Sequence, residues 1–320
     1  MTQDQSHLTM IVEALDASPE IRPTGVDPVR DALFVGSGDS LSSALLAQAY
    51  GHRAASSGDT AFTGRFPAGV ETVVGISHSG TSGATVQTLR LAAESGRRTV
   101  AVTSNGDSPL AETADEVQIV PSLGISETVP CAGHLMLALG VAAVCGEDTS
   151  GAGRALAARV SADAVLIETA VAALPAQAPS GIAILSLPDL RGAADFWMLK
   201  LIEATGVSVR TTALEESGHV DYFIGPQAHV AVQLIGAAGR ARFDRLAQAL
   251  EHTGQCVLPV RFTAAEDAST RDGLLAELSG AVIGTLVAEE AALRWGRPPF
   301  RGGAVNMDAA HIKLDGQAIA

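Results

Sequence analysis

Short apolar segments alternate with helical patterns along most of this chain, and this alternation constrains the fold more than any other feature. Ala32–Val35, Thr72–Ile76 and Arg98–Thr103 are each short enough to be a buried strand, and a loop of small residues follows each of them. A helical pattern then leads to the next apolar segment. Buried strands that alternate with helices form a parallel sheet with helices on both faces. The sequence therefore predicts an α/β protein.

A second series of the same kind follows a polar segment at Gly146–Gly151, so we predict a diverged repeat of one doubly wound unit. The predicted domains are a helical lead-in at 1–30, a first domain at 31–150, a second domain at 151–300 and a tail at 301–320. The remaining strands are predicted at Glu116–Val120, Ile182–Ser186, Val207–Arg210, Val230–Ile235 and Cys256–Val260. Long helices are predicted at Cys131–Val144 and near 153–173, 192–204, 239–252 and 271–293. Ligands bind at the carboxyl ends of the strands in such sheets.

Composition argues against several classes of function. The formal charge is −14 at pH 7, which disfavours binding to nucleic acid or to an anionic membrane surface. Cys131, Cys145 and Cys256 have no CxxC spacing, so we expect neither a disulfide framework nor a zinc site. The first residues lack the pattern of a secretory signal, and no apolar stretch is long enough to span a bilayer. We expect a cytoplasmic protein that uses no metal and no cofactor.

The loop Ser77-His78-Ser79-Gly80-Thr81-Ser82 follows the strand at Thr72–Ile76 and precedes a helical pattern. Backbone N–H groups at the start of a helix and several hydroxyls favour an anion, and a phosphate group is the natural guest. The same residues are also compatible with an ordinary turn in which a serine caps the helix. An earlier loop, Gly36–Ser40, has a similar composition but lacks the spacing of a dinucleotide fingerprint, so a nicotinamide cofactor is disfavoured.

The ionisable candidates lie in the second half of the chain. Lys200 and Glu203 share one face of a largely apolar helix, where charges are unusual, although a surface ion pair would have the same spacing. A predicted loop then carries three titratable groups, which are Glu215, Glu216 and His219. His311 and Lys313 lie in a glycine-containing tail, where a lysine is more often solvated than catalytic.

The motifs and their spacing resemble those of the sugar isomerase (SIS) domain family, from about residue 30 to the C-terminus. Ser77–Ser82 is similar to the family's phosphate loop, and Gly36–Ser40 is similar to its first loop. The most specific likeness is to the two-domain isomerase half of glucosamine-6-phosphate synthase and to its stand-alone relatives. In that pattern a KxxE pair precedes a histidine by sixteen residues, as Glu203 precedes His219 here. Glu216 and Lys313 also match positions of the pattern.

The resemblance implies two SIS subdomains, each a flavodoxin-like three-layer sandwich, and a homodimer with shared active sites. It implies a small sugar phosphate as the ligand, held by Ser37, Gly38, Ser40, Ser77, His78, Ser79, Ser82, Glu127 and Glu216. Glu203 would transfer a proton between C1 and C2 of the open-chain sugar, and Lys200 would orient it. His219 would open the sugar ring, commonly from the neighbouring subunit, and Lys313 would close over the sugar.

Three departures from the family pattern affect the expected substrate. His219-Val220-Asp221 stands where the family has HGP, and Val129–His134 lacks the hydroxyls that usually line the sugar. His78 replaces the usual glutamine of the phosphate loop. We predict a phosphosugar aldose-ketose isomerase, with or without release of an amine, that acts through an enediol or enolamine. The alternatives are an isomerase of the phosphoglucose/phosphomannose type, whose HNE motif is absent, and a sugar-phosphate-binding regulator without catalysis.

Overall fold

The computed structural model describes residues 6–20, 27–225, 227–262 and 269–296, and these divide into two compact units, each built on one parallel sheet. We call them the first-sheet unit and the second-sheet unit. The first-sheet unit comprises described residues 17–20, 27–124 and 132–153. The second-sheet unit comprises described residues 6–16, 125–131, 154–225, 227–262 and 269–296. The prediction of an α/β fold with two doubly wound parallel sheets is confirmed.

The first sheet has five parallel strands in the order β2-β1-β3-β4-β5. The strands are β1 (Ala32–Gly36), β2 (Arg53–Ser56), β3 (Thr72–Ile76), β4 (Arg98–Thr103) and β5 (Glu116–Ile119). β1 and β3 are buried along their whole length, which explains their continuous apolar sequences. β2 lies on one side of β1, and β3, β4 and β5 follow one another on the other side. The order reverses between β1 and β3.

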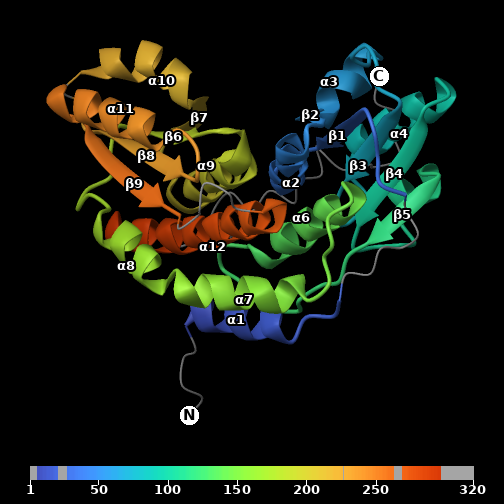
Figure 1. The fold of residues 1–320 in the computed structure, drawn as a ribbon, viewed down its shortest axis with the longest axis horizontal. Helices are drawn as coiled ribbons and strands as arrows, with labels where there is room; N and C mark the ends of the chain where they lie inside the picture. The colour runs from blue at the N-terminus through green and yellow to red at the C-terminus, as the bar shows by residue number, and fades with distance from the viewer. Residues whose placement is uncertain (1–5, 21–26, 226, 263–268, 297–320) are drawn as a thin grey trace. The chain divides into compact units, whose positions relative to one another are not determined.

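Helices cover both faces of the first sheet (Figure 1). On one face, Val86 and Leu89 of α4 (Gly83–Glu94) and Leu110 of α5 (Pro109–Thr113) pack in a core with strand residues such as Val73. On the other face lie α2 (Asp39–Leu45) and α6 (Ala132–Val144), which pack against each other. The unit also contains the short η1 (Leu46–Tyr50) and α3 (Ser57–Thr63).

The second sheet has four parallel strands in the order β7-β6-β8-β9. The strands are β6 (Gly181–Ser186), β7 (Val209–Ala213), β8 (His229–Ile235) and β9 (Cys256–Arg261). The order reverses between β6 and β8, as it does between β1 and β3. The two units therefore repeat one winding, as the sequence predicts.

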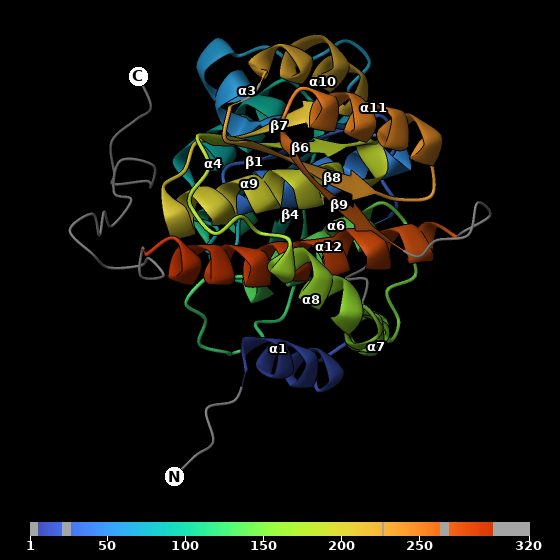
Figure 2. The same cartoon turned by 90° about the vertical axis from the view of Figure 1, so that its left-hand side faces the viewer.

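The helices of the second-sheet unit also lie on both faces of its sheet, as Figures 1 and 2 show. One face carries α10 (Leu214–Val220), η3 (Asp221–Ile224) and α11 (Arg240–His252). The other carries α8 (Ala164–Ala172), α9 (Arg191–Thr205) and α12 (Thr270–Arg294), with η2 (Pro188–Leu190) before α9. This placement follows from the right-handed crossover rule. The connection from β6 to β7 and the connection from β7 to β8 run in opposite directions along the sheet, so their helices lie on opposite faces.

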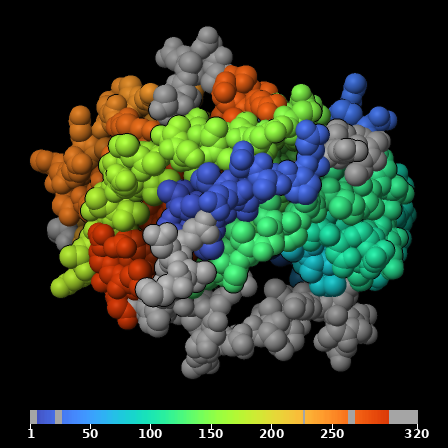
Figure 3. Space-filling model, turned by 90° about the horizontal axis from the view of Figure 1, so that it is seen from below, coloured from blue at the N-terminus to red at the C-terminus, as the bar shows by residue number. Residues whose placement is uncertain are grey.

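The N-terminal helix α1 (His7–Asp16) packs on the second-sheet unit together with residues 125–131. Figure 3 shows α1 running along the surface beside α7 (Ala152–Ala162) and α8. The domain boundaries predicted from the sequence stay a prediction. Within the described residues, no helix is both long enough and apolar enough to cross a membrane.

Several predicted elements differ from those observed. The single helix predicted at 153–173 is two helices, separated at Asp163, whose carboxylate accepts hydrogen bonds from Arg159 Nε and Ser279 Oγ at 2.7 Å each. The prediction of a loop around His219 is wrong, because these residues form α10 and η3. The strand predicted at Val207–Arg210 begins two residues later, and β2 and α3 were not predicted.

Candidate functional site

The loops that follow β1 and β3 leave the first sheet at the point where its strand order reverses. In open α/β sheets, ligands bind at the carboxyl ends of the strands at such a reversal. Because β1 pairs directly with β3, Ser37 and Ser77 follow adjacent strands at the same edge. The two hydroxyl-rich loops of the sequence therefore follow neighbouring strands at the carboxyl end of the sheet, a place that we call the first reversal point.

The Ser77–Ser82 loop leaves the start of α4 without a side-chain cap. Ser82 is the N-cap residue of α4, but its side chain makes no capping hydrogen bond, and its Oγ lies 3.1 Å from Ser77 Oγ. Ser77 is buried and its Oγ accepts a hydrogen bond from the Gly80 N–H at 3.1 Å. The ordinary serine-capped turn is thus not what forms here. The first N–H groups of α4 are left to another acceptor, as an anion site requires.

Glycine is required at position 80 of this loop. Gly80 has φ +70°, and a Cβ there would lie 2.0 Å from Ser108 Oγ. Ser108 is the N-cap of α5, where its hydroxyl accepts from the Ala111 N–H and donates to the Asn105 carbonyl. The close approach of Ser108 to Gly80 therefore holds the loop after β3 against the loop after β4.

Two exposed residues of the loop face solvent, His78 and Ser79. Ser79 Oγ lies 2.8 Å from Thr81 Oγ1. The structure thus separates the predicted ligand residues of this loop into two groups. Ser77, whose hydroxyl contacts that of the half-buried Ser82, shapes the loop from inside, whereas Ser79 and His78 present polar groups outward.

The loop after β1 is shorter than predicted, because α2 already begins at Asp39. Ser37 Oγ lies 2.7 Å from Ser57 Oγ of α3, so this hydroxyl is engaged within the fold. Gly38 is exposed with φ +58°, and Ser40 is buried in the first turn of α2. Of the three predicted ligand residues, Gly38 offers the most accessible backbone.

Lys200 and Glu203 form a pair that is only partly open to water. Lys200 is fully buried on α9, its Nζ donates to Glu203 Oε2 at 2.9 Å, and the Glu203 side chain is 38% exposed. Lys200 Nζ also lies 5.0 Å from the centre of the Phe196 ring. The alternative of a solvated surface pair is excluded by the burial of Lys200. The arrangement is a carboxylate with access to solvent, held in place by a buried cation.

His219 and Glu216 are both exposed on α10. α10 and α9 lie on opposite faces of the second sheet, so the chain does not bring His219 together with Glu203 on one face (Figure 2). Asp221, two residues after His219, is fully buried at the end of α10. Its carboxylate accepts hydrogen bonds from Ser217 Oγ at 2.6 Å and from Arg210 Nη2. Asp221 therefore fixes the end of the helix that carries His219.

Glu127, a predicted ligand residue, is engaged by the protein itself. Its Oε1 lies 3.1 Å from His7 Nε2 and accepts the Cys131 N–H at 3.0 Å, while His7 Nδ1 lies 2.6 Å from Glu289 Oε1. Burial lowers the pKa of His7, but the hydrogen bonds and charges of the two glutamates outweigh it and raise the pKa to about 9. The protonated ring thus bridges two carboxylates. Sequence reasoning missed His7, because its partners are distant in the chain.

At the corresponding reversal point of the second sheet, between β6 and β8, two carboxyl groups lie close to the start of α9. Glu277 of α12 is fully buried and accepts the N–H groups of Ala193 and Gly192 at the start of α9. Burial raises the pKa of Glu277 well above its usual value, and burial also raises that of Asp189 in η2. The sequence signal available for Glu277 was a charged residue within an apolar helical pattern, which is the signal that singled out Lys200.

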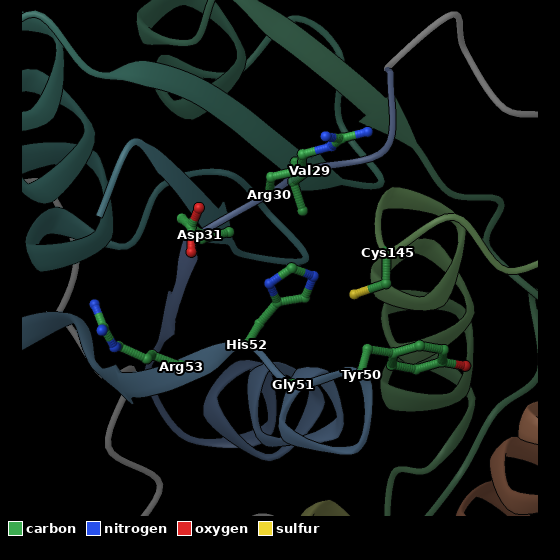
Figure 4. Close-up of a pocket in the computed structure, with 9 residues that line it drawn as sticks. Val29, Arg30, Asp31, Tyr50, Gly51, His52, Arg53 and Cys145 are labelled. Carbon is green, nitrogen blue, oxygen red and sulfur yellow. The ribbon is translucent and has the colours of Figure 1, made fainter. Parts of the chain in front are cut away.

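A separate pocket of about 450 Å³ lies at the opposite, amino ends of β1 and β2 (Figure 4). His52 and Cys145 face its centre, and burial lowers the pKa of His52 and raises that of the Cys145 thiol. A neutral imidazole and a protonated thiol give this pocket no activated nucleophile. Because this pocket lies at the amino ends of the strands, it is separate from Ser37 and Ser77, which follow the carboxyl ends.

Two predictions for the site concern metals and the tail. Among the described residues, no group of three or more His, Cys, Asp or Glu side chains could hold a metal ion. Lys313, the predicted tail lysine, and His311 lie outside the described residues.

No protein-family model matches the chain, and no curated protein matches it. The fold is similar to that of glucosamine-6-phosphate deaminase from Thermotoga maritima, with a TM-score of 0.70 and 17% identity over 91% of this chain and 95% of that one. It is also similar to the C-terminal domain of glucosamine-fructose-6-phosphate aminotransferase from Francisella tularensis (TM-score 0.69, 13% identity, 92% and 95%). Tagatose-6-phosphate ketose/aldose isomerase from Escherichia coli gives a TM-score of 0.67 and 16% identity over 92% of this chain and 89% of that one. The chain therefore has the α/β fold of these sugar-phosphate enzymes.

Proposed function

We propose that the protein is an SIS-family enzyme that isomerises a sugar phosphate between its aldose and ketose forms, with release of an amine if the substrate is an amino sugar. The fold of the sugar-phosphate enzymes supports the class of ligand. The Lys200–Glu203 pair is the observation that carries the chemistry, because a solvent-accessible carboxylate with a fixed orientation is what proton transfer between adjacent carbons requires.

In the proposed reaction, the phosphate group binds the uncapped start of α4 below Ser77–Ser82. The Glu203 carboxylate removes the proton from C2 of the open-chain aldose. The electron pair of that C–H bond forms the C1=C2 double bond, and the former carbonyl oxygen O1 takes the negative charge. Transfer of the O2–H proton to O1 through the enediol, followed by return of the proton from Glu203 to C1, leaves the carbonyl group at C2 and gives the ketose. Lys200 is fully buried, so it acts as a positioning residue for Glu203 rather than as a direct contact of the sugar.

His219 would open the sugar ring in a site shared between two subunits of a homodimer. Two features support this arrangement: α9 and α10 lie on opposite faces of one sheet, and His219 is exposed. Next to His219, the apolar side chains of Val220, Tyr222 and Phe223 are exposed by 50%, 46% and 79%. An apolar surface of this kind beside a titratable group suits contact with a second copy of the chain.

The chemistry is tested with Glu203→Gln, which keeps the shape of the side chain and removes the base. Candidate substrates come from a thermal-shift screen of hexose and aminohexose phosphates against the wild type. Proton NMR in heavy water then follows exchange at C1 and C2. We expect Glu203→Gln to bind the same compounds but to lose exchange by at least about 10²-fold, while Glu168→Gln on the exposed face of α8 keeps the wild-type rate. Undiminished exchange in Glu203→Gln would exclude this base.

The shared site is tested by mixing two variants, Glu203→Gln and His219→Gln, after dissociation and reassembly. If each site takes Glu203 from one subunit and His219 from the other, mixed dimers contain one intact site. Random mixing then restores about a quarter of the wild-type activity. A mixture as inactive as the two separate variants would contradict a shared site. Ligand binding without exchange in the wild type would instead favour a sugar-phosphate-binding regulator.

A further inference from the structure

We propose that His78 is the titratable contact of the anion site at Ser77–Ser82, so that the site binds doubly charged anions such as phosphate monoesters more tightly when His78 is protonated. This inference rests on the proposed function, because it takes the loop after β3 as the anion site. It adds a pH dependence and a preference for charge to that site.

The backbone of His78 is held in a fixed position. Its carbonyl oxygen accepts three hydrogen bonds from the end of β4 and the loop that follows it. These come from Ser104 N at 3.2 Å, Ser104 Oγ at 2.7 Å and Thr103 Oγ1 at 3.1 Å. The starting point of the side chain is therefore defined, although the residue itself is exposed.

The imidazole ring lies between the Ser104 loop and the first turn of α6. Its Nδ1 is 3.4 Å from Ser104 Oγ, and a Cβ at Gly133 would lie 3.2 Å from Cδ2 and 3.5 Å from Nε2 of the ring. The missing side chain at Gly133 thus makes room for the ring. Within the described part of the chain, Nε2 has no hydrogen-bond partner, so it remains a donor for a ligand.

Few charges compete with an imidazolium at this position. His78 is the only ionisable residue in Ser77–Ser82, and the first turns of α4 and α6 contain no acidic residue. The Ser104 loop contributes Asp107, which is exposed. On α6, His134 is buried with its Nδ1 2.9 Å from Ser43 Oγ. The protonated ring would therefore supply the formal positive charge that the hydroxyls of the loop do not.

Histidine changes what the site can do compared with the glutamine found in the resembling motif. A glutamine amide donates a hydrogen bond without charge at every pH. An imidazole gains a positive charge within the pH range 5 to 8, and hydrogen bonds between charged groups are about twice as strong as neutral ones. Anion binding and protonation of His78 must then favour each other by thermodynamic linkage.

The test uses inorganic sulfate, which keeps two negative charges between pH 5.5 and 8.5, so any pH dependence comes from the protein. We measure its dissociation constant by isothermal titration calorimetry across this range for the wild type, His78→Gln and His252→Gln. His252 is an exposed histidine at the end of α11 and serves as the control. For the wild type and the control we expect the constant to rise about tenfold from pH 5.5 to 8.5. His78→Gln should bind sulfate with one constant across the range, near the weak value of the wild type at pH 8.5.

Three outcomes decide the proposal. A flat profile in His78→Gln with the wild-type slope kept in His252→Gln supports it. A slope that survives in His78→Gln overturns the role of His78 but leaves the anion site of the proposed function intact. If the wild type binds neither sulfate nor glucose 6-phosphate at any pH, the anion site itself is refuted and the inference falls with it.

Discussion

Replacing His7 with glutamine should destabilise the second-sheet unit in a pH-dependent way. The protonated ring donates to Glu127 and Glu289, at 3.1 and 2.6 Å, from a position where its side chain is 9% exposed. Burial favours the neutral ring, but the two glutamates raise the pKa from 6.5 to about 9. The ring thereby connects α1, the segment 125–131 and α12.

The sign of the effect follows from the direction of the His7 pKa shift, and its size follows from the magnitude of that shift. A pKa that is higher in the folded than in the unfolded state stabilises the fold while the group is protonated. The contribution is complete below about pH 6.5 and is lost as the pH rises through about 9. At 1.36 kcal/mol per pKa unit the shift corresponds to about 3 kcal/mol, and solvent access to the carboxylates reduces this to about 1–2 kcal/mol.

Urea unfolding followed by tryptophan fluorescence measures this contribution. Both tryptophans of the chain, Trp197 and Trp295, belong to the second-sheet unit, so the signal reports on the unit that contains His7. We expect His7→Gln to lose about 1–2 kcal/mol of unfolding free energy at pH 6 and to approach the wild type at pH 10. His252→Gln should have the unfolding free energy of the wild type at both pH values. A deficit of His7→Gln that is equal at pH 6 and pH 10 would refute the reasoning.

Two further predictions concern buried positions in each unit. The raised pKa of Glu277 means that its stabilising contribution is present below about pH 4.5 and is lost as the pH rises through the raised value. Glu277→Gln should therefore gain about 1 kcal/mol relative to the wild type between pH 5 and pH 8 in urea unfolding, and a constant difference would contradict this. Gly80→Ala should cost about 2–3 kcal/mol and weaken sulfate binding, because the new Cβ meets Ser108 at φ +70°. Gly96→Ala, at φ +74° with open space around it, should cost about 1 kcal/mol and leave sulfate binding unchanged, and equal costs in a thermal melt would argue against the contact with Ser108.

Central strands could be predicted from the sequence because both of their faces are buried. Thr72–Ile76 and Arg98–Thr103 are observed with the predicted bounds, as continuous apolar sequences favour. β2 was missed because Arg53–Ser56 is a four-residue edge strand without a buried residue. α10 was taken for a loop because only Leu214 and Ser217 are buried in its seven residues, so its sequence shows no helical apolar face.

In the candidate site, too, only the features that depend on local sequence could be predicted. The pair at Lys200 and Glu203 could be predicted, because residues three apart share a helix face whatever the rest of the fold does. The engagement of Glu127 could not, since its partner His7 is 120 residues away and meets it only through the packing of α1. Local spacing predicts local pairs, whereas contacts between distant segments depend on how the helices pack.

The two sheets share one winding but differ at the point where each strand order reverses, and this difference bears on how many ligands the chain can bind. In the first, the start of α4 has no side-chain cap and faces hydroxyls. In the second, the carboxyl group of Glu277 already accepts the N–H groups at the start of α9, with Asp189 nearby. A second anion would have to displace a buried side chain and approach another carboxyl group, both of which oppose binding. Calorimetry with a phosphate monoester should therefore give one site per chain, and a stoichiometry of two would show that Glu277 does not prevent an anion from binding at the start of α9.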